Sequence, residues 1–375
     1  MNKERYHAGI GLALKLVGMI AVALASLVAG PALADSDPAL VAAARREGRV
    51  VVYSVLSNKA AQPLIADFQA VYPGIEVDYD GDKGSTEMDA RFRAESAAGK
   101  FTADVVWSSA MDMQMKLVGD GFATPYRSPE AAGLPVWANY RNLAYATTQE
   151  PVVIVYNRDL LAPADVPRDH DGLAALLVRQ PERLKGRITS FDIEKSGVGY
   201  MLAAQDSLAN RKQAGLLAAF GRAGLRQSGG TGDMLTGINN GTFLLGYNMM
   251  GAYALSRGRK DLLRLGVVFP ADYTLVLSRV AFVSKRATHP NAARLWLDYL
   301  LSARGQKVLG DAIELYPIRA GVKARFTAAG LQKAIGPAIR QVPLDMTLAA
   351  AMDDPTRSRI LAAWRKATGQ IAAAQ

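Results

Sequence analysis

The chain has no cysteine and only three histidines, and these two shortages exclude several kinds of chemistry. Without cysteine there are no disulfides, no thiol catalysis and no cysteine-based metal sites. Beyond residue 34 only His170 and His289 remain, and neither has a second histidine at metal-ligand spacing. We therefore expect both to be surface or capping residues, and we predict neither a metal nor a cofactor.

Motifs for catalysis and for nucleic-acid binding are also missing. The sequence has no Gly-x-Ser-x-Gly turn, no His-Glu-x-x-His and no complete Ser/His/Asp set. Carboxylate pairs remain open as an acid–base alternative, but no pattern indicates one. The basic residues are spread along the chain without a basic block or aromatic interleaving. We predict a protein that is not an enzyme and has no nucleic-acid partner.

The first 34 residues are typical of a secretory signal peptide. Lys3 and Arg5 give a positive start, an apolar run follows at 17–29, and Ala32-Leu33-Ala34 supplies small residues at the end. We expect cleavage after Ala34 and a periplasmic protein. The alternative is a retained membrane anchor, but Lys15 shortens the apolar stretch. No later segment has about 18 consecutive apolar residues, so the mature chain is not expected to span a membrane.

Removing residues 1–34 lowers the formal net charge from +10 to +8, because that segment holds three Lys/Arg and one Glu. A positive balance is compatible with anionic ligands but does not specify one. The remaining chain of roughly 340 residues is long enough to be stabilised by its core alone, and chains of that size usually form two domains.

The first part of the mature chain alternates strands and helices. We predict strands at 49–55, 75–79 and 103–107, where β-branched and apolar residues cluster. Between them lie a predicted helix at 60–71 and a second one that begins at Ser85-Thr86, with Asp89 completing a capping box. This β-α-β-α-β order predicts a parallel sheet with helices on both faces.

The rest of the chain continues this alternation with different spacing. We predict strands at 151–156, 187–191, 243–247, 266–269, 274–277 and 280–283. We predict helices at 173–178, 198–208, 211–220, 234–238 and 291–301. There are no internal repeats, linkers or low-complexity segments. We therefore predict an α/β fold of two lobes connected by crossing strands, each lobe a mostly parallel sheet with helices on both faces and a ligand cleft between them.

Five stretches together resemble the extracellular solute-binding proteins of ABC importers, in the branch that includes the bacterial ferric-binding proteins. They are VVVYSVLSNKAAQPLIADF, ADVVWSS, LKGRITSFDIEKSGVGY, ELYPIRAGV and the long FPADYTLVLSRVAFVSKRATHPNAARLWLDYLLSARGQKVL. The resemblance implies a first lobe of 35–147 plus 272–312 and a second lobe of 148–271 plus 313–375. It also implies an importer permease as partner, hinge closure on the ligand, and a monomer.

Short loops that lead from strands into helices are the expected ligand-binding segments, because ligands of open parallel sheets bind beyond the carboxyl ends of strands. Helix N-termini there present free N–H groups and partial positive charge. Gly229-Gly230-Thr231-Gly232 is one such loop, and Lys83 in another could supply a charge. The predicted ligand-binding residues are Ser54, Ser57, Asn58, Ser85, Thr86, Ser108, Ser109, Ser196, Gly197, Val198, Thr231, Tyr247 and Asn248. The alternative for each Ser or Thr is a simple helix cap.

The resemblance also allows a test for iron. Ferric-binding relatives hold iron with a histidine after the first strand, a carboxylate after the third and a pair of adjacent tyrosines. The matching positions here are Ser57, Ser109 and the segment 246–251, GYNMMG. Fe³⁺ favours phenolate and carboxylate oxygen, so this set does not fit it.

The anion-holding part of the relatives' site persists. Ser196, Gly197 and Val198 match the loop that grips a phosphate-like anion, and Thr231 and Asn248 match two side chains of the same pocket. We predict a periplasmic importer component that binds a small organic anion, which is a phosphorylated compound, a phosphonate or a carboxylate. The alternative is a ferric-iron binder with a non-standard ligand set that includes Tyr247 and Tyr253.

Overall fold

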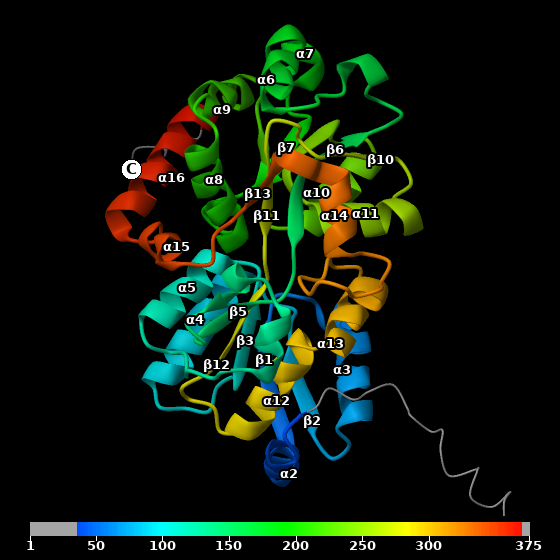
Figure 1. The fold of residues 1–375 in the computed structure, drawn as a ribbon. Helices are drawn as coiled ribbons and strands as arrows, with labels where there is room; N and C mark the ends of the chain where they lie inside the picture. The colour runs from blue at the N-terminus through cyan, green and yellow to red at the C-terminus, as the bar shows by residue number, and fades with distance from the viewer. Residues whose placement is uncertain (1–35, 370–375) are drawn as a thin grey trace, which may run out of the picture. The chain divides into compact units, whose positions relative to one another are not determined.

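The computed structural model describes residues 36–369, so the predicted signal peptide and its cleavage after Ala34 lie outside the described residues. From Ser36 onward the chain forms one compact unit that contains two β-sheets flanked by helices (Figure 1). None of the helices between residues 36 and 369 is both long enough and apolar enough to cross a bilayer.

The first sheet has the strand order β2-β1-β3-β12-β5-β4. Its strands are β1 (Arg49–Ser54), β2 (Glu76–Asp80), β3 (Val105–Ser108), β4 (Asn139–Tyr140), β5 (Ala144–Ala146) and β12 (Val280–Val283). β1 pairs in parallel with β2 and β3, and β12 pairs antiparallel with β3 and β5. Strand β12 therefore inserts a late part of the chain into a sheet that is otherwise built early.

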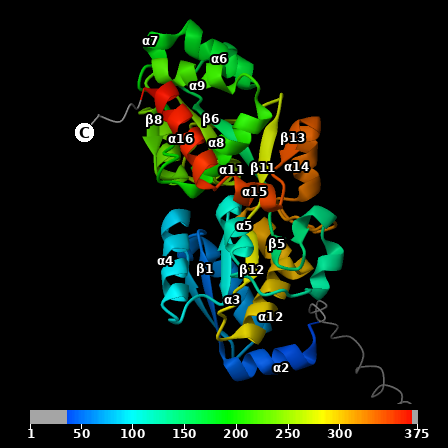
Figure 2. The same ribbon diagram turned by 90° about the vertical axis from the view of Figure 1, so that its left-hand side faces the viewer.

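Helices cover both faces of the first sheet (Figure 2). Alternate residues of β1 point to opposite faces, so that Val51 packs with one core cluster and Val52 with another. The first cluster includes α4 (Ser85–Ala97) and α5 (Met111–Gly119), and the second includes α3 (Asn58–Val71) and α12 (Pro290–Leu301).

The second sheet has the order β13-β11-β6-β9-β7-β8, with β10 paired to β6. Its strands are β6 (Glu150–Asn157), β7 (Ile188–Phe191), β8 (Arg226–Ser228), β9 (Leu245–Met250), β10 (Leu265–Val268), β11 (Thr274–Leu277) and β13 (Ile339–Gln341). One face packs on α6 (His170–Arg179), α8 (Gly197–Ala209), α9 (Gln213–Arg222) and α16 (Asp354–Thr368). The other face packs on α10 (Thr231–Asn239) and α11 (Gly251–Lys260).

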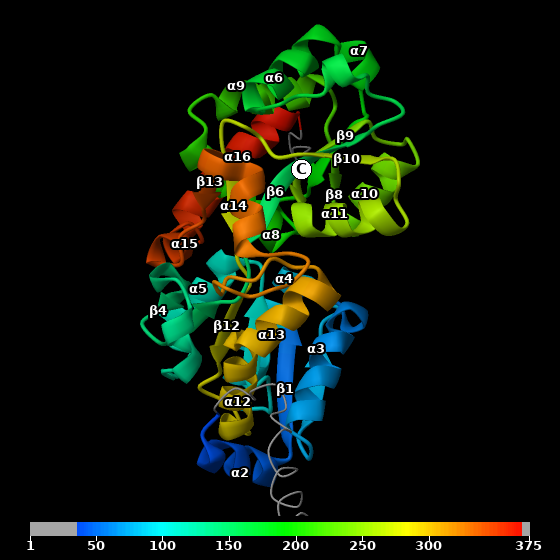
Figure 3. The same ribbon diagram turned by 45° about the vertical axis from the view of Figure 1, so that its right-hand side comes forward.

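The other helical segments connect or flank these layers (Figure 3). They are α2 (Pro38–Glu47), α7 (Pro181–Leu184), α13 (Ala303–Val308), α14 (Ala328–Ile335), α15 (Met346–Ala350), the π-helical turn Leu309–Ile313, and short 3₁₀ turns at Pro129–Gly133, Val136–Ala138, Pro163–Asp165 and Gly336–Ala338.

Two crossings between the sheets are hydrogen-bonded to each other. The first connects β5 to β6 through Thr147 and Thr148, and the second connects β11 to β12 through Ser278 and Arg279. Thr147 N donates to Arg279 O at 2.8 Å, and Arg279 N donates to Thr148 Oγ1 at 2.8 Å. The predicted lobe boundaries remain a proposal. By sheet membership β11 belongs with the second sheet, so this crossing lies at Ser278–Arg279 rather than at residue 272.

The strand predictions agree with the structure to within about two residues at most boundaries, but one predicted helix cap is wrong. The N-cap of α4 is Gly84, which has no side chain to donate or accept, and Asp89 pairs instead with Arg93 on the next turn. The capping box therefore does not form, and the first amides of α4 have no side-chain partner. Helices α5 and α11 were not predicted.

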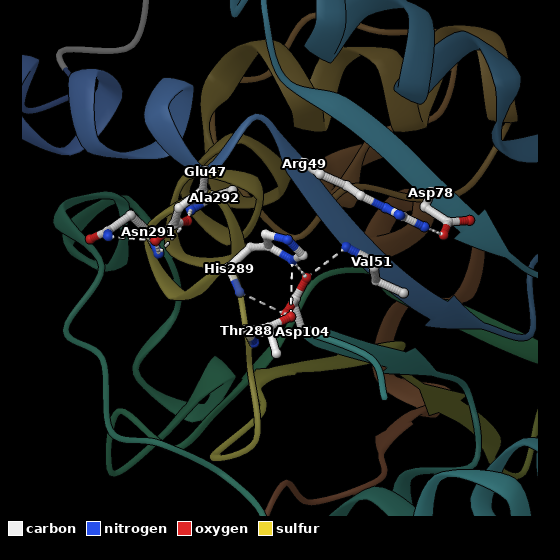
Figure 4. Close-up of polar contacts among 9 residues, drawn as sticks. All are labelled: Glu47, Arg49, Val51, Asp78, Asp104, Thr288, His289, Asn291 and Ala292. Atoms are coloured by element: carbon white, nitrogen blue, oxygen red, sulfur yellow. Dashed lines mark hydrogen bonds and ion pairs between the residues drawn. The ribbon is translucent and has the colours of Figure 1, made fainter. Parts of the chain in front are cut away.

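Asp104, a buried carboxylate just before β3, connects strand β1 to the start of helix α12 (Figure 4). Asp104 is fully buried, and its Oδ2 accepts from Val51 N at 2.8 Å and lies 2.8 Å from His289 Nδ1. Its Oδ1 accepts from the backbone N–H groups of Thr288 at 2.8 Å and His289 at 3.0 Å. Glu47 caps the next residues of α12 in the same way. His289 is therefore a capping residue, as predicted.

We predict that Asp104→Ala lowers the free energy of unfolding by about 3–5 kcal/mol, because the buried N–H of Val51 and the partly buried N–H groups of Thr288 and His289 lose their acceptor. Asp78→Ala is the control, since Asp78 forms an exposed ion pair with Arg49, which contributes little to stability. Urea unfolding of both variants checks this. Equal midpoints for the two variants would contradict it.

Candidate functional site

A cavity of about 560 Å³ lies between the elements of the two sheets. Loops at the carboxyl ends of β1, β2 and β3 contribute from the first sheet, and loops that precede α8, α10 and α11 contribute from the second. Its lining consists of Val55, Ser57, Gly81, Asp82, Lys83, Gly84, Ser85, Ser109, Phe191, Lys195, Ser196, Val198, Gly229, Gly230, Thr231, Gly232, Leu235, Met250, Tyr253, Arg257 and Arg279. The volume suits an organic molecule of metabolite size.

Several helices begin at this cavity, and they differ in how their first turns are capped. Ser57 Oγ accepts from Ala60 N at the start of α3, and Ser196 Oγ accepts from Gly199 N at the start of α8. Helices α4, α10 and α11 have N-caps without any side-chain hydrogen bond: Gly84, Gly230 and Met250. Their first N–H groups remain available as donors, with the partial positive charge of a helix N-terminus.

Four of the glycines at the cavity are not required by internal packing. A Cβ placed on Gly84, Gly229, Gly230 or Gly232 would have no other atom within 4 Å. Gly230 has φ −154° and ψ 153°, an extended conformation open to any residue. The absence of side chains here leaves the backbone open to the close approach of a ligand.

The charged side chains that line the cavity are mostly positive: Lys83, Lys195, Arg257 and Arg279, against the single carboxylate Asp82. All four of these cations also have acidic partners outside the lining, and the partner of Arg279 is Glu150 at 2.9 Å. Lys83 contacts Asp80 at 2.9 Å, Lys195 contacts Asp192 at 3.4 Å, and Arg257 contacts Asp261 at 2.7 Å. The lining therefore favours an anion.

Arg279 differs from the other cations because it is buried, with an exposed fraction of 1%. Its Nε lies 2.9 Å from Glu150 Oε1, and its Nη2 donates to the Tyr253 hydroxyl at 2.9 Å. Burial disfavours its charged form, but Glu150 outweighs this and holds the pKa of Arg279 above its ordinary value. Burial raises the pKa of Tyr253, although Arg279 opposes the shift.

The two lobes touch directly beside the cavity. Thr86 Oγ1 on α4 donates to Lys195 O at 3.0 Å. A Cβ on Gly197 would lie 2.7 Å from both Ser85 Oγ and Met113 Sδ, so a larger residue there would displace these side chains where α8 approaches the first lobe. Thr86 and Gly197 therefore hold the lobes together rather than line the cavity.

The predicted ligand-binding residues fall into three groups. The residues that line the cavity are Ser57, Ser85, Ser109, Ser196, Val198 and Thr231. Those that lie next to it without lining it are Ser54, Asn58, Thr86, Ser108 and Gly197. Ser54 and Ser108 are fully buried and cap their own turns, since their Oγ atoms accept from Leu56 N and Ala110 N at 3.2 Å. Asn58 Oδ1 accepts from Gly81 N at 2.8 Å.

Tyr247 and Asn248, the third group, do not line the cavity. Both point into the second lobe, where the Tyr247 hydroxyl and Asn248 Nδ2 each donate to Asp206 Oδ2 at 2.7 Å, and Tyr273 donates to Oδ1 at 3.0 Å. Burial raises the pKa of Asp206. His170 stacks on Tyr273 with ring centroids 4.0 Å apart, so it belongs to this buried cluster. The strand alternation of β9 is broken at Asn248, which has φ 56°.

Sequence reasoning missed Glu150 and Arg279, and it named Tyr253 only in the ferric alternative. A signal was present, because Arg279 interrupts the apolar run TLVLSRVAFV and Glu150 directly precedes the apolar run PVVIVY. Charges of opposite sign at the ends of two apolar strands indicate a buried pair. The sequence alone gives no reason to pair these two strands, which lie over 100 residues apart.

The lining contains few ligands for a hard metal ion. Asp82 and Tyr253 are its only side chains that could give an anionic oxygen, and Tyr247 lies elsewhere. Across residues 36–369 no group of three His, Asp or Glu side chains is arranged to hold a metal.

Comparison with known proteins agrees with this geometry. A family model described as bacterial extracellular solute-binding protein matches residues 49–312. A substrate-binding protein of an ABC transporter from Agrobacterium tumefaciens is 34% identical, with a TM-score of 0.81 over 85% of this chain and 94% of that chain. No curated protein sequence matches the chain.

Two more distant structures share the fold. AfuA from Actinobacillus pleuropneumoniae, solved with exogenous fructose-6-phosphate, has a TM-score of 0.67 at 19% identity, over 87% of this chain and 100% of that chain. The apo ferric ion-binding protein A of Pasteurella haemolytica has a TM-score of 0.68 at 18% identity, over 87% and 100%.

The chain thus belongs to the family of bacterial extracellular solute-binding proteins. It is a periplasmic solute-binding protein of an ABC transporter, and the predicted family and two-lobe α/β fold are confirmed. The prediction of mostly parallel sheets is wrong, because at least half of the strand pairs in each sheet are antiparallel.

A buried carboxyl group at the contact between the lobes gives a testable pH dependence. Asp112 on α5 is 1% exposed, and its Oδ2 has no hydrogen-bond partner. Helix α5 packs there on α8 and α15 of the other lobe. Burial raises the pKa of Asp112 to about 7. The folded state therefore binds more protons than the unfolded chain between about pH 4 and 7, and stability falls as pH rises through this window.

We predict that Asp112→Asn raises the free energy of unfolding at pH 8 by about 2–4 kcal/mol and has little effect at pH 4, because the amide never ionises. Urea unfolding at both pH values checks this, with the exposed Asp78→Asn as control. An equal effect of Asp112→Asn at the two pH values would refute the assignment.

Proposed function

We propose that this protein captures a small organic anion in the 560 Å³ cavity and delivers it to the permease of an ABC importer. The anion is a phosphorylated compound, a phosphonate or a carboxylate. The observation that carries the proposal is the set of helix starts without side-chain caps at Gly84, Gly230 and Met250, which face a lining with four cations and one carboxylate.

The physical argument rests on unpaired donors. The first N–H groups of a helix have no partner within the helix, and an anion can satisfy several of them at once. Hydrogen bonds to a charged group contribute about 1.5–3 kcal/mol each, about twice the value for neutral pairs. Ser85, Ser196 and Thr231 add hydroxyl donors at the same cavity. The sugar phosphate in AfuA, which has the same fold, supports this ligand class.

The mechanism we infer is hinge closure. Ligand contacts come from both lobes, with the first lobe as 35–147 plus 272–312 and the second as 148–271 plus 313–375. A ligand held by both stabilises the closed state, which the permease then recognises. We further propose that the protein acts as a monomer without catalytic activity, and that it reaches the periplasm after cleavage at Ala34.

The ferric alternative has less support. Fe³⁺ needs several anionic oxygens, and the cavity offers Asp82 and Tyr253 among four cations. Adding ferric citrate to the purified protein distinguishes the two proposals, because a phenolate bound to iron gives a visible charge-transfer colour.

A thermal-shift screen tests the proposed function. The panel contains phosphorylated sugars, phosphonates and carboxylic acids, with neutral sugars as control. A ligand at 100 times its Kd stabilises the protein by about 2.7 kcal/mol. We expect a shift with members of the anionic classes only. No shift at millimolar concentrations, together with colour and stabilisation by ferric citrate, would overturn the proposal. Mass spectrometry of the co-purified ligand then names the compound.

We predict that Gly230→Asp weakens binding of the best anion by at least about tenfold without unfolding the protein. Asp is a favoured N-cap, so its carboxylate would occupy the free N–H groups of α10 and repel the ligand. The extended backbone and the open space at Gly230 permit the side chain. Titration calorimetry measures the affinity.

The matched control is Gly215→Asp on α9, where a Cβ also meets no atom and which does not line the cavity. It should bind as the wild type does. Unchanged affinity in Gly230→Asp would show that the N-terminus of α10 does not hold the anion.

A further inference from the structure

One buried cation at the cavity, Arg279, has a donor nitrogen without a hydrogen-bond partner. Among the described residues, a small set of buried side-chain nitrogen and oxygen atoms has no hydrogen-bond partner, and Arg279 is the residue of that set that lines the cavity. Its Nη1 is one of these atoms. A buried donor without a partner costs about 1–3 kcal/mol, which a bound acceptor would recover.

Tyr253 supplies a second donor next to Arg279. Its oxygen accepts from Arg279 Nη2 at 2.9 Å, which leaves the hydroxyl proton free to be donated. Tyr253 also lines the cavity, and it comes from the first turn of α11, whose N-cap has no side-chain hydrogen bond. Arg279 and Tyr253 together resemble a two-donor clamp for two oxygens of one group.

Surrounding contacts hold the guanidinium of Arg279 in place. Glu150 is fully buried, accepts from Thr148 Oγ1 at 2.9 Å, and contacts Arg279 from the opposite crossing. The backbone of Arg279 is hydrogen-bonded to both Thr147 and Thr148. A clamp fixed in this way loses little conformational entropy when a ligand binds.

We propose that Arg279 and Tyr253 form a second anion position in the cavity, distinct from the glycine and hydroxyl loops at Ser196 and Gly229–Gly232. This rests on the proposed function and narrows it: the ligand has two anionic groups, as in a phosphorylated carboxylic acid or a dicarboxylate. The first group binds the loops of α8 and α10, and the second binds the clamp at the crossing strands. A cavity of about 560 Å³ has room for both.

The experiment compares probes that differ by one anionic group. The pairs are glycerol 3-phosphate with 3-phosphoglycerate, and butyrate with succinate, measured by calorimetry and thermal shift. We expect the member with two anionic groups to bind at least about 30-fold more tightly. One additional hydrogen-bonded contact to a charged group increases affinity by about this factor.

The double variant Glu150→Gln/Arg279→Gln tests the clamp directly. Removing Arg279 alone would leave Glu150 buried without a partner, so both charges are neutralised together. This double variant should bind the two members of each probe pair with equal affinity. Its affinity for the member with one anionic group should equal that of the wild type. Tyr253→Phe, which removes only the hydroxyl, should reduce the preference about tenfold. Arg264→Gln, an exposed arginine outside the cavity lining, is the control.

The outcomes separate the two proposals. If probes bind but the preference is the same in the wild type, the double variant and Tyr253→Phe, the clamp is refuted and the proposed function stands. If no anion binds to the wild type, both fall. Thermal unfolding of each variant without ligand shows whether it is folded. If the double variant does not fold, the result for Tyr253→Phe alone decides the test.

Discussion

Unpaired backbone N–H groups at helix N-termini are the feature on which the rest of this structure depends. Serine, threonine or aspartate at these positions would satisfy them, yet α4 and α10 begin after Gly84 and Gly230. The packing does not demand glycine there, since a Cβ would meet nothing. Both helices give up the stabilisation of a side-chain cap, typically near 1 kcal/mol relative to an uncapped residue. We propose that these donors remain free because a ligand, rather than the protein, is their partner.

The crossing strands set how these donors can move relative to one another. Thr147, Thr148 and Arg279 connect the two crossings through backbone bonds, and Trp107 Nε1 adds a bond to Thr147 Oγ1 at 2.8 Å. The base of the cavity is therefore a bonded unit. The contacts on the other side are of a different kind, a single hydrogen bond from Thr86 to Lys195 O and the packing of α5 on α8 and α15. In the proposed hinge closure, these contacts separate while the crossings stay bonded and act as the hinge.

The sequence predicts the sheets well because their cores are made of β-branched runs such as RVVVYSV and PVVIVY, whose burial depends on local composition. It also predicts the loops at Ser196 and Thr231 as cavity segments, since glycine and hydroxyl residues follow predicted strands there. Tyr247 and Asn248 were placed in the cavity by the resemblance, in which Asn248 matches a pocket side chain and Tyr247 lies in the segment that matches the ferric tyrosines. Adjacent strand residues normally point to opposite faces. The left-handed backbone at Asn248 changes that alternation and turns both toward Asp206. Arg279 and Glu150 escaped prediction because their pairing is set by the order of strands in the second sheet.

Under the proposed function, the same charges disfavour the binding of a ferric ion. A ferric centre collects anionic oxygens around a trivalent cation, so cations in its lining are costly. At an effective dielectric constant of about 20, two unit charges of the same sign about 6 Å apart repel by about 3 kcal/mol. A trivalent ion multiplies that figure, and Arg279 cannot move away or lose its proton. Ser57 and Ser109 match positions where ferric-binding relatives have a histidine and a carboxylate, so two metal ligands, one of them anionic, are missing there. Under the proposed function, the sign of the ligand's charge follows from these few side chains.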